Sequence, residues 1–395
     1  MRTETIQTDI LAEIKKIEPV IRRHSFEAEK NRRLSEPVLK ALKESKMFRI
    51  WKPKAYGGLE TDPITGFEAL EALSKIDSAA GWNVSLSMAL DTILQWFSDE
   101  AMEEVFASED EVIVAGSWHP PGKAIPVKGG YEVTGQWSIV SGCQYANWFF
   151  MNAAIIDGDQ PRMDENGHPV LLMMLTPASK GKMVATWDTI GMRGTGSHDM
   201  SLEKVFIPEH LSTPMVPIDQ ANGSAFQGPL YQNSVWYSIA AIAGPALGIA
   251  RAAIDDTLDL IKNKIPNYTE TTLKDLQTVQ MRLAEAEATL GAGRAYFYET
   301  IQSTWTTALQ GLRITMEQRM KVQLATTFAV QSSVKAVNII HDLAGLTGMR
   351  ESHPIQRHFR DVNTIRQHAF TSYHRYQAVG QLMLGLEPNW GFLYF

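Results

Sequence analysis

His368 is the side chain of this sequence best suited to proton chemistry. An imidazole has a reference pKa of about 6.5, so it can donate or accept a hydrogen bond and can carry a proton near neutral pH. A histidine in a helical pattern can equally be a buried packing residue, and from its position alone both interpretations stay open. The other histidines late in the chain show no metal-ligand spacing and no carboxylate set, so we expect no metal site.

Two further segments combine hydroxyl groups with glycines. Ser141-Gly142 closes a predicted strand, and Arg193-Gly194-Thr195-Gly196-Ser197 follows Trp187. Small residues would let the backbone of the second segment lie against a flat ring system, with Trp187 and Thr195 as walls. From the residues alone, however, both segments are also typical of ordinary turns. Ser117 precedes Ser141 by 24 residues and is either a second hydroxyl of such a site or a common strand-end serine.

Composition favours a soluble enzyme of two or three domains. The chain has 395 residues, 44% hydrophobic and 21% charged, with a net charge of −7. No basic cluster suggests nucleic acid or an anionic membrane as a partner. The single cysteine, Cys143, excludes an internal disulfide and fits a reducing compartment. The N-terminus has no signal-peptide pattern, and the apolar stretch 239–250 is too short to span a membrane, so we expect a cytoplasmic protein.

Hydrophobic periodicity divides the chain into three regions. Residues 1–110 have a helical pattern, which includes a long buried helix predicted over 79–97. Short apolar runs over 111–212 predict strands, with a hairpin turn at Lys128-Gly129-Gly130. A turn-rich linker opens residues 213–395, where the helical pattern returns, and a last helix is predicted over 354–384.

Several motifs in this order resemble the acyl-CoA dehydrogenase superfamily over nearly the whole chain. They are Gly130-Tyr131-x-Val133-x-Gly135-x-Trp137, Ser141-Gly142, Gly191-Met192-Arg193-Gly194-Thr195-Gly196-Ser197, Val205-Phe206-Ile207-Pro208 and Arg360-Asp361. The resemblance implies an α+β fold. It consists of an N-terminal helical domain (1–110), a central β-barrel or sandwich domain (111–212) and a C-terminal four-helix bundle with a leading linker (213–395).

Within that superfamily the chain is similar to the branch of two-component flavin-dependent monooxygenases. Dehydrogenases commonly carry a catalytic glutamate where Ala369 stands, and an alanine cannot remove a proton from an acyl α-carbon. The segments Ser138-x-x-Ser141-Gly142-Cys143 and Arg366-x-His368-Ala369 are similar to this monooxygenase branch. Its members include hydroxylases of p-hydroxyphenylacetate and of a secosteroid phenol, and monooxygenases of dibenzothiophene and of indole or indole-3-acetate.

The resemblance implies cofactors and roles for residues. The cofactors would be O2 and reduced flavin, FMNH2 or FADH2, delivered by a separate NAD(P)H:flavin reductase and reacting through a C4a-(hydro)peroxide. The sequence has no Gly-x-Gly-x-x-Gly motif after a strand, so no nicotinamide site is expected. Ser141 would lie beside flavin N5, and His368 would be the second catalytic residue. The remaining residues expected at the flavin are Ser117, Trp187, Arg193, Gly194, Thr195, Gly196 and Ser197.

The expected substrate is an aromatic small molecule from the catabolism of such compounds. The phenol hydroxylases carry a substrate-facing histidine on the helix after Gly81-Trp82, but Ser87–Asp91 contains none. This absence favours an indole-like ring, such as indole-3-acetate, over a simple phenol. The residues expected to contact it are Met88, Leu90, Trp118, His368 and Phe370.

The family resemblance also implies a homotetramer, and we expect its aromatic C-terminal segment 386–395 to be packed. Two alternatives to the monooxygenase stay open at this stage. The first is an acyl-CoA dehydrogenase or related oxidase, against which Ala369 is the main objection. The second is a non-catalytic family member that binds no flavin.

Overall fold

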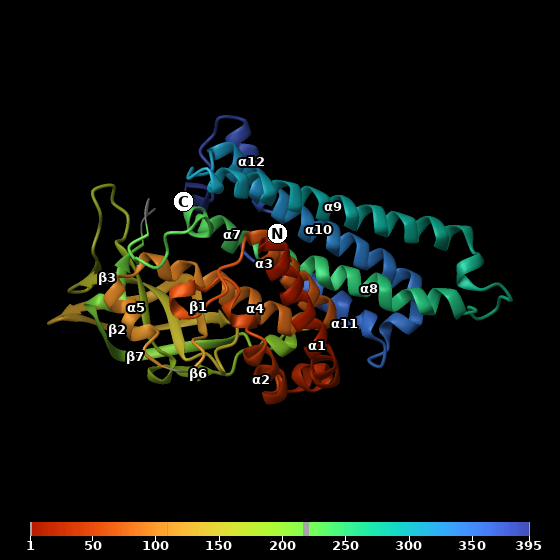
Figure 1. Cartoon of the computed structure of the whole chain (residues 1–395), viewed down its shortest axis with the longest axis horizontal. Helices are drawn as coiled ribbons and strands as arrows, with labels where there is room; N and C mark the ends of the chain where they lie inside the picture. Colours follow the sequence, from red (N-terminus) through yellow and green to blue (C-terminus); the bar gives the residue numbers. More distant parts are fainter. Residues whose placement is uncertain (1, 109, 216–220, 395) are drawn as a thin grey trace.

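The computed structural model describes residues 2–108, 110–215 and 221–394, so part of the predicted linker, 216–220, lies outside the described residues. A helical N-terminal region packs beside a β-sheet, and long helices of the C-terminal region extend away from both (Figure 1). This is the expected α+β architecture. The strands begin at Val114 and end at Pro214, and the division into domains at residues 110 and 212 stays a prediction.

The described part of the N-terminal region contains five α-helices. Helix α4 is buried on nearly every side and supplies one wall of the site described below. The predicted helix over 79–97 was wrong in length, because α4 ends at Asp91 and a turn of 3-10 helix follows. Thr92 and Gln95 stabilise this break, since their side chains bond the carbonyls of Ala89 and Thr92. The helices are α1 (Arg2–Asn31), α2 (Glu36–Glu44), α3 (Pro63–Ile76), α4 (Ser78–Asp91) and α5 (Asp99–Val105).

The eight strands found in the described residues form one mixed sheet in the order β6-β7-β2-β1-β3-β5-β8, with β4 paired to β3. In the described residues this hydrogen-bonded path runs from β6 to β8, and it forms the central β region expected between the two helical regions. The predicted hairpin is confirmed, because Val127 faces Gly130 and Gly129 takes a φ of +82°. The strands are β1 (Val114–Val127), β2 (Gly130–Val140), β3 (Trp148–Asp157), β4 (Gln160–Pro161), β5 (Leu171–Pro177), β6 (Lys182–Val184), β7 (His198–Pro208) and β8 (Ser212–Pro214).

The C-terminal region is built on four packed helices, α8 to α11. Segment 234–263 is long and apolar enough to cross a membrane, contrary to the length argument above, but 89% of its most apolar window is buried inside the protein. It is therefore a core helix pair. The helices are α6 (Pro229–Gln232), α7 (Ser234–Ala240), α8 (Ala243–Asn263), α9 (Gln277–Leu309), α10 (Met316–Ala344), α11 (Pro354–Ile365) and α12 (Arg375–Met383).

The predicted last helix over 354–384 is two helices, separated by a turn at 366–374 that contains His368. The buried Gln323 of α10 donates a hydrogen bond from Nε2 to the Phe370 carbonyl at 2.9 Å. The backbone N–H groups of Thr371 and Ser372 both bond the His368 carbonyl. A side chain from another helix therefore stabilises the interruption, and this contact has no local sequence signal.

Candidate active site

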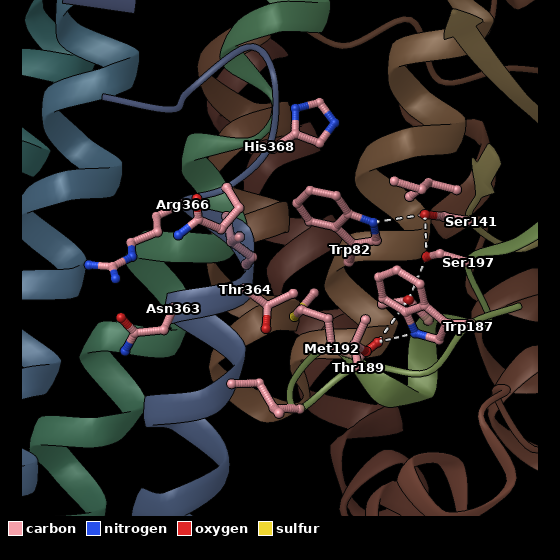
Figure 2. Close-up of a pocket in the computed structure, with 15 residues that line it drawn as sticks. Trp82, Ser141, Trp187, Thr189, Met192, Ser197, Asn363, Thr364, Arg366 and His368 are labelled. Atoms are coloured by element: carbon pink, nitrogen blue, oxygen red, sulfur yellow. Dashed lines mark hydrogen bonds between the residues drawn. The ribbon is translucent and has the colours of Figure 1, made fainter. Parts of the chain in front are cut away.

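A cavity of about 510 Å³ lies where α4, the end of β2, the loop 187–197 and the end of α11 meet. Figure 2 shows Trp82 between His368 on one side and Ser141 and Ser197 on the other. Most of the exposed lining surface is apolar, and three buried hydroxyls, those of Ser141, Thr195 and Ser197, lie together on one wall. The lining residues are Trp82, Ile139, Ser141, Trp187, Thr189, Ile190, Met192, Thr195, Ser197, Asn363, Thr364, Ile365, Arg366, Gln367 and His368.

A chain of hydrogen bonds runs along one wall of this cavity. The indole Nε1 of Trp82 donates to Ser141 Oγ at 3.0 Å, and Ser141 Oγ lies 2.7 Å from Ser197 Oγ. Ser197 Oγ lies 2.6 Å from Thr195 Oγ1, which donates to the Met192 carbonyl at 2.8 Å. The three hydroxyls are buried, with side chains at most 7% exposed.

The two ends of this chain fix the direction of its protons. An indole N–H can only donate and a backbone carbonyl can only accept, so each hydroxyl donates toward Met192. Ser141 therefore donates to Ser197 and accepts from Trp82. One lone pair of Ser141 is left for a donor that enters the cavity.

Helix α11 fixes the position of the loop that contains Met192, the last acceptor in this series of hydrogen bonds. Met192 takes a left-handed φ of +54°, and its N–H donates to Asp361 Oδ1 at 2.6 Å. Asp361 Oδ2 accepts a second bond from Ser78 at 2.5 Å. Burial raises the pKa of the Asp361 carboxyl, while Arg357 and these hydrogen bonds oppose the shift. The Met192 carbonyl also accepts from Trp187 Nε1 at 3.0 Å, which fixes the Trp187 ring beside the cavity.

The geometry of His368 assigns its tautomer. Its Nδ1 accepts the backbone N–H of Phe370 at 3.3 Å, so in the neutral ring the proton is on Nε2. Burial lowers the pKa of His368 to about 4, and the ring is neutral at pH 7. It meets the Trp82 ring edge-on with centroids 5.6 Å apart. His368 therefore offers an N–H donor and carries no charge.

A second, smaller cavity of about 50 Å³ adjoins His368 on its other side. Three aromatic side chains, those of Trp118, Phe370 and Phe392, line it. The Phe392 ring packs edge-on against Trp118 and Phe370, with ring centroids 5.6 and 4.9 Å apart. His368 lines both cavities and is their common boundary. The lining residues of the second cavity are Ser85, Leu86, Ala89, Leu90, Gly116, Trp118, Val235, Ser238, Ile239, Ile242, His368, Phe370 and Phe392.

Two family models match this chain on either side of the sheet. The N-terminal domain of acyl-CoA dehydrogenase matches residues 11–107, and the C-terminal domain of acyl-CoA dehydrogenase matches residues 240–373. The chain belongs to the acyl-CoA dehydrogenase family. Residues in both matched segments line the larger cavity. Helix α4 lies in the segment 11–107, and α11 and His368 lie in the segment 240–373.

Relatives of similar length within this family are named as monooxygenases. An indole-3-acetate monooxygenase of Pseudomonas putida is 29% identical over 93% of this chain and 91% of its own. The oxygenase component of an FADH2-dependent resorcinol hydroxylase from a Rhizobium species is 28% identical over 94% and 92%. The structure of XiaF from a Streptomyces species, in complex with FADH2 and glycerol, has a TM-score of 0.91 and 26% identity, and 98% of each chain is covered.

Most residues expected from the acyl-CoA dehydrogenase resemblance lie at the two cavities. Ser141, Trp187, Thr195, Ser197 and His368 line the first, and Leu90, Trp118, His368 and Phe370 line the second. The structure brings these two sets together at His368, while their chemical roles stay predictions.

Five expected residues do not line either cavity. Met88 is fully buried in the core, and Ser117 lies on β1 between Gly116 and Trp118, which do line the second cavity. Gly194 packs beneath α4, where an added Cβ would lie 3.0 Å from that of Ala79, and Gly196 has a φ of +58°, which suits a glycine turn. Arg193 lines a separate surface pocket.

Sequence reasoning gave no role to three residues that organise the hydrogen bonds of the site: Trp82, Met192 and Asp361. Asp361 belongs to the Arg360-Asp361 motif quoted above, but the sequence did not indicate what its carboxyl group would do. Trp82 lies in a largely apolar helix, so the sequence pattern assigns its indole to the core. Met192 acts through its backbone N–H and carbonyl, which a sequence pattern of side chains does not indicate. Among the described residues, no group of three or more His, Cys, Asp and Glu side chains could hold a metal ion.

Proposed function

We propose that this protein is the oxygenase component of a two-component flavin-dependent monooxygenase that hydroxylates an aromatic or heteroaromatic small molecule. The observation that carries the proposal is the pair of cavities that meet at His368. The larger one has a polar edge, and the smaller one is lined by aromatic and aliphatic side chains. Relatives named as an indole-3-acetate monooxygenase and a resorcinol hydroxylase support the same activity.

The larger cavity suits a reduced flavin, FMNH2 or FADH2. Its walls include two indoles, from Trp82 and Trp187, that can face a flat ring system, and the spare lone pair of Ser141 suits the N5–H donor of the reduced ring. When bound, reduced flavin activates O2 and delivers one oxygen atom to the aromatic ring, while the other oxygen leaves as water.

The chain's own residues then have separate jobs. Ser141 would accept a hydrogen bond from the N5–H of a bound reduced flavin, because its own hydroxyl proton is donated to Ser197. His368 offers its Nε2–H at the boundary where oxygen must pass between the cavities. The aromatic and aliphatic side chains around that boundary would limit the access of water to it.

An acyl-CoA dehydrogenase activity has no support in the lining of these cavities. Removal of an α-proton from an acyl chain needs a carboxylate base. None of the described residues that line either cavity is an aspartate or a glutamate. Ala369, at the position of the missing glutamate, lies in the turn after α11.

The proposal includes a separate NAD(P)H:flavin reductase, a homotetramer and a cytoplasmic location. Large exposed apolar side chains of the C-terminal region support self-assembly, since Phe328, Tyr373, Met383 and Leu384 are 40 to 77% exposed. The names of relatives as oxygenase components support the reductase. The single buried Cys143 suits a reducing compartment.

The test is a reconstitution with and without a flavin reductase. Purified protein with NADH, flavin, O2 and an aromatic compound should form no hydroxylated product until a reductase is added. Turnover with NADH alone in a reductase-free preparation would contradict the two-component arrangement. Reduced flavin that fails to bind, or is oxidised with no product from any aromatic compound, would contradict the monooxygenase.

A further inference from the structure

The turn at 366–374 that contains His368 is held to helix α10 by a buried glutamine. Gln323 is fully buried, and its Nε2 donates one hydrogen bond to the Phe370 carbonyl at 2.9 Å and another to Thr327 Oγ1 at 3.2 Å. Both amide protons are therefore used, and a rotated amide would place its oxygen against the Phe370 carbonyl. These contacts fix the orientation of the side chain.

One peptide group links Gln323 to the backbone of His368. The Phe370 carbonyl, which accepts from Gln323, and the N–H of Thr371 belong to the same planar peptide unit. That N–H donates to the His368 carbonyl at 3.0 Å. On the other side of the Phe370 Cα, the N–H of Phe370 itself donates to His368 Nδ1 at 3.3 Å. The backbone and the imidazole of His368 are thus both bonded to the segment that Gln323 fixes.

Packing alone does not account for a glutamine at this position. Its Oε1 atom is buried and has no hydrogen-bond partner among the described residues, which is unfavourable for a polar group. A methionine would fill a similar volume without leaving a buried oxygen unpaired. The favourable contribution of the Gln323 amide is its two hydrogen bonds, and the one that leaves α10 goes to the turn.

We propose that Gln323 is a positioning residue for the oxygenation: it holds His368 at the boundary of the two cavities, with Nδ1 bonded to Phe370 and the proton on Nε2. Gln323 lines neither cavity, so it acts only through the turn. The consequence for catalysis rests on the proposed function, whereas the environment and tautomer of His368 can be measured without any turnover.

Solid-state carbon–nitrogen correlation spectra of the histidine-labelled protein test the position of the ring. They distinguish Nδ1 from Nε2 by the carbons bonded to each, and among the ten histidines the His368 signals are those absent from His368→Asn. At pH 7.5 the wild type should show one His368 environment, protonated on Nε2. Gln323→Met should show a second environment or a mixture of tautomers. A mixture of tautomers in the wild type, or a wild-type spectrum in Gln323→Met, would overturn the inference.

Gln331→Met is the matched control. Gln331 lies about two turns further along α10, and its Nε2 faces the Thr371 carbonyl at 3.5 Å, at the limit of hydrogen bonding. This variant should leave the His368 spectrum unchanged. An equal change in both variants would show that any alteration of α10 disturbs the turn, and would overturn the role given to Gln323.

Gln323→Asn is a second variant that keeps the amide but shortens the side chain by one methylene group. Because the shorter amide cannot reach the Phe370 carbonyl in the same way, the His368 spectrum should change as it does in Gln323→Met. A wild-type spectrum in Gln323→Asn would show that the contact is not needed and would overturn the inference.

The oxygenation assay separates this inference from the proposed function. Product formed per reduced flavin should fall at least about threefold in Gln323→Met, as expected for one net hydrogen bond, with flavin affinity unchanged. Unchanged coupling in a variant whose His368 spectrum has changed would overturn the positioning role and leave the monooxygenase intact. A changed His368 spectrum in a protein that hydroxylates no aromatic compound would support the contact and contradict the monooxygenase.

Discussion

The Asp361 carboxylate accepts the backbone N–H of Met192 at 2.6 Å, across 169 residues of sequence. It thereby ties the bundle helix α11 to the loop that presents Trp187, Thr195 and Ser197 to the larger cavity. Met192 is held in a left-handed conformation, which is costly for a side chain with a Cβ. The position of the hydroxyl chain therefore depends on this contact between two distant segments.

Asp361→Asn should weaken both folding and flavin binding. The amide keeps one acceptor oxygen but loses the charge that strengthens the bonds from Met192 and Ser78. We expect the free energy of unfolding to fall by about 1–2 kcal/mol and the affinity for reduced flavin to fall with it. Denaturant titration and anaerobic flavin titration measure the two effects. Asp256→Asn, which alters the His358 pair elsewhere in the bundle, should affect stability only.

Trp82→Phe should uncouple the reaction while flavin still binds. Phenylalanine preserves a large ring but removes the Nε1–H that orients Ser141. Less product should form per reduced flavin consumed, and hydrogen peroxide release should rise. Trp137→Phe is the control, because it removes an indole bond to the Asn152 carbonyl in the sheet core, at 2.9 Å, and Trp137 does not line the cavity. Equal coupling in the two variants would remove Trp82 from the site's chemistry.

Local sequence patterns predicted elements whose causes are local. The hairpin at Lys128-Gly129-Gly130 was predictable because Gly129 supplies the positive φ that the turn needs. The segment 366–374 was not, since its pattern continues a helix and the break depends on Gln323 from α10. Tertiary contacts decide such interruptions, and a single sequence does not record them.

The candidate site also has a part that the sequence could predict and a part that depends on tertiary contacts. Ser141, Thr195 and Ser197 are side chains within recognisable motifs, so their proximity to a common cavity could be expected from the family resemblance. The order of their hydrogen bonds could not, because it is set by the Met192 carbonyl and by an indole N–H on a buried helix.

The pH dependence of stability should include a contribution from His368. Burial lowers its pKa from 6.5 to about 4 in the folded protein. Between these values the unfolded chain binds a proton that the folded chain does not, so stability falls as pH falls from about 6.5 toward 4. The loss should be on the order of 1–3 kcal/mol, and His368→Gln should lack it. Unfolding free energies of both proteins at pH 7.5, 5.5 and 4.5 measure the difference.

Phe392→Ala should enlarge the range of aromatic compounds accepted. The smaller cavity offers about 50 Å³, well below the roughly 150 Å³ in which benzene binds in an engineered cavity, and Phe392 forms one of its walls. Removing the ring should favour two- and three-ring compounds in competition assays, with a stability loss of about 1–3 kcal/mol because the ring is only partly buried. An unchanged preference between one- and three-ring compounds would show that another wall sets the size limit.

His368→Asn and His368→Gln together separate proton-donating from packing roles. The Nδ1 atom accepts from Phe370, so the useful proton is on Nε2. An asparagine amide reaches about as far as Nδ1, whereas a glutamine amide reaches about as far as Nε2 and can replace that donor. We expect hydroxylation to fall at least about tenfold in His368→Asn, at the low side of the range for acid–base roles because water can substitute. His368→Gln should retain more of it.

Coupling is the measurement that decides this prediction. In His368→Asn, flavin binding should survive and hydrogen peroxide release should rise as product formation falls, because oxygen that is not delivered to the ring is lost as peroxide. Ser141→Ala should raise peroxide release as well, but even without substrate, since it removes the contact proposed for flavin N5. Equal and unchanged coupling in both His368 variants would leave the imidazole as a packing residue, and Ser141 as the residue on which the chemistry depends.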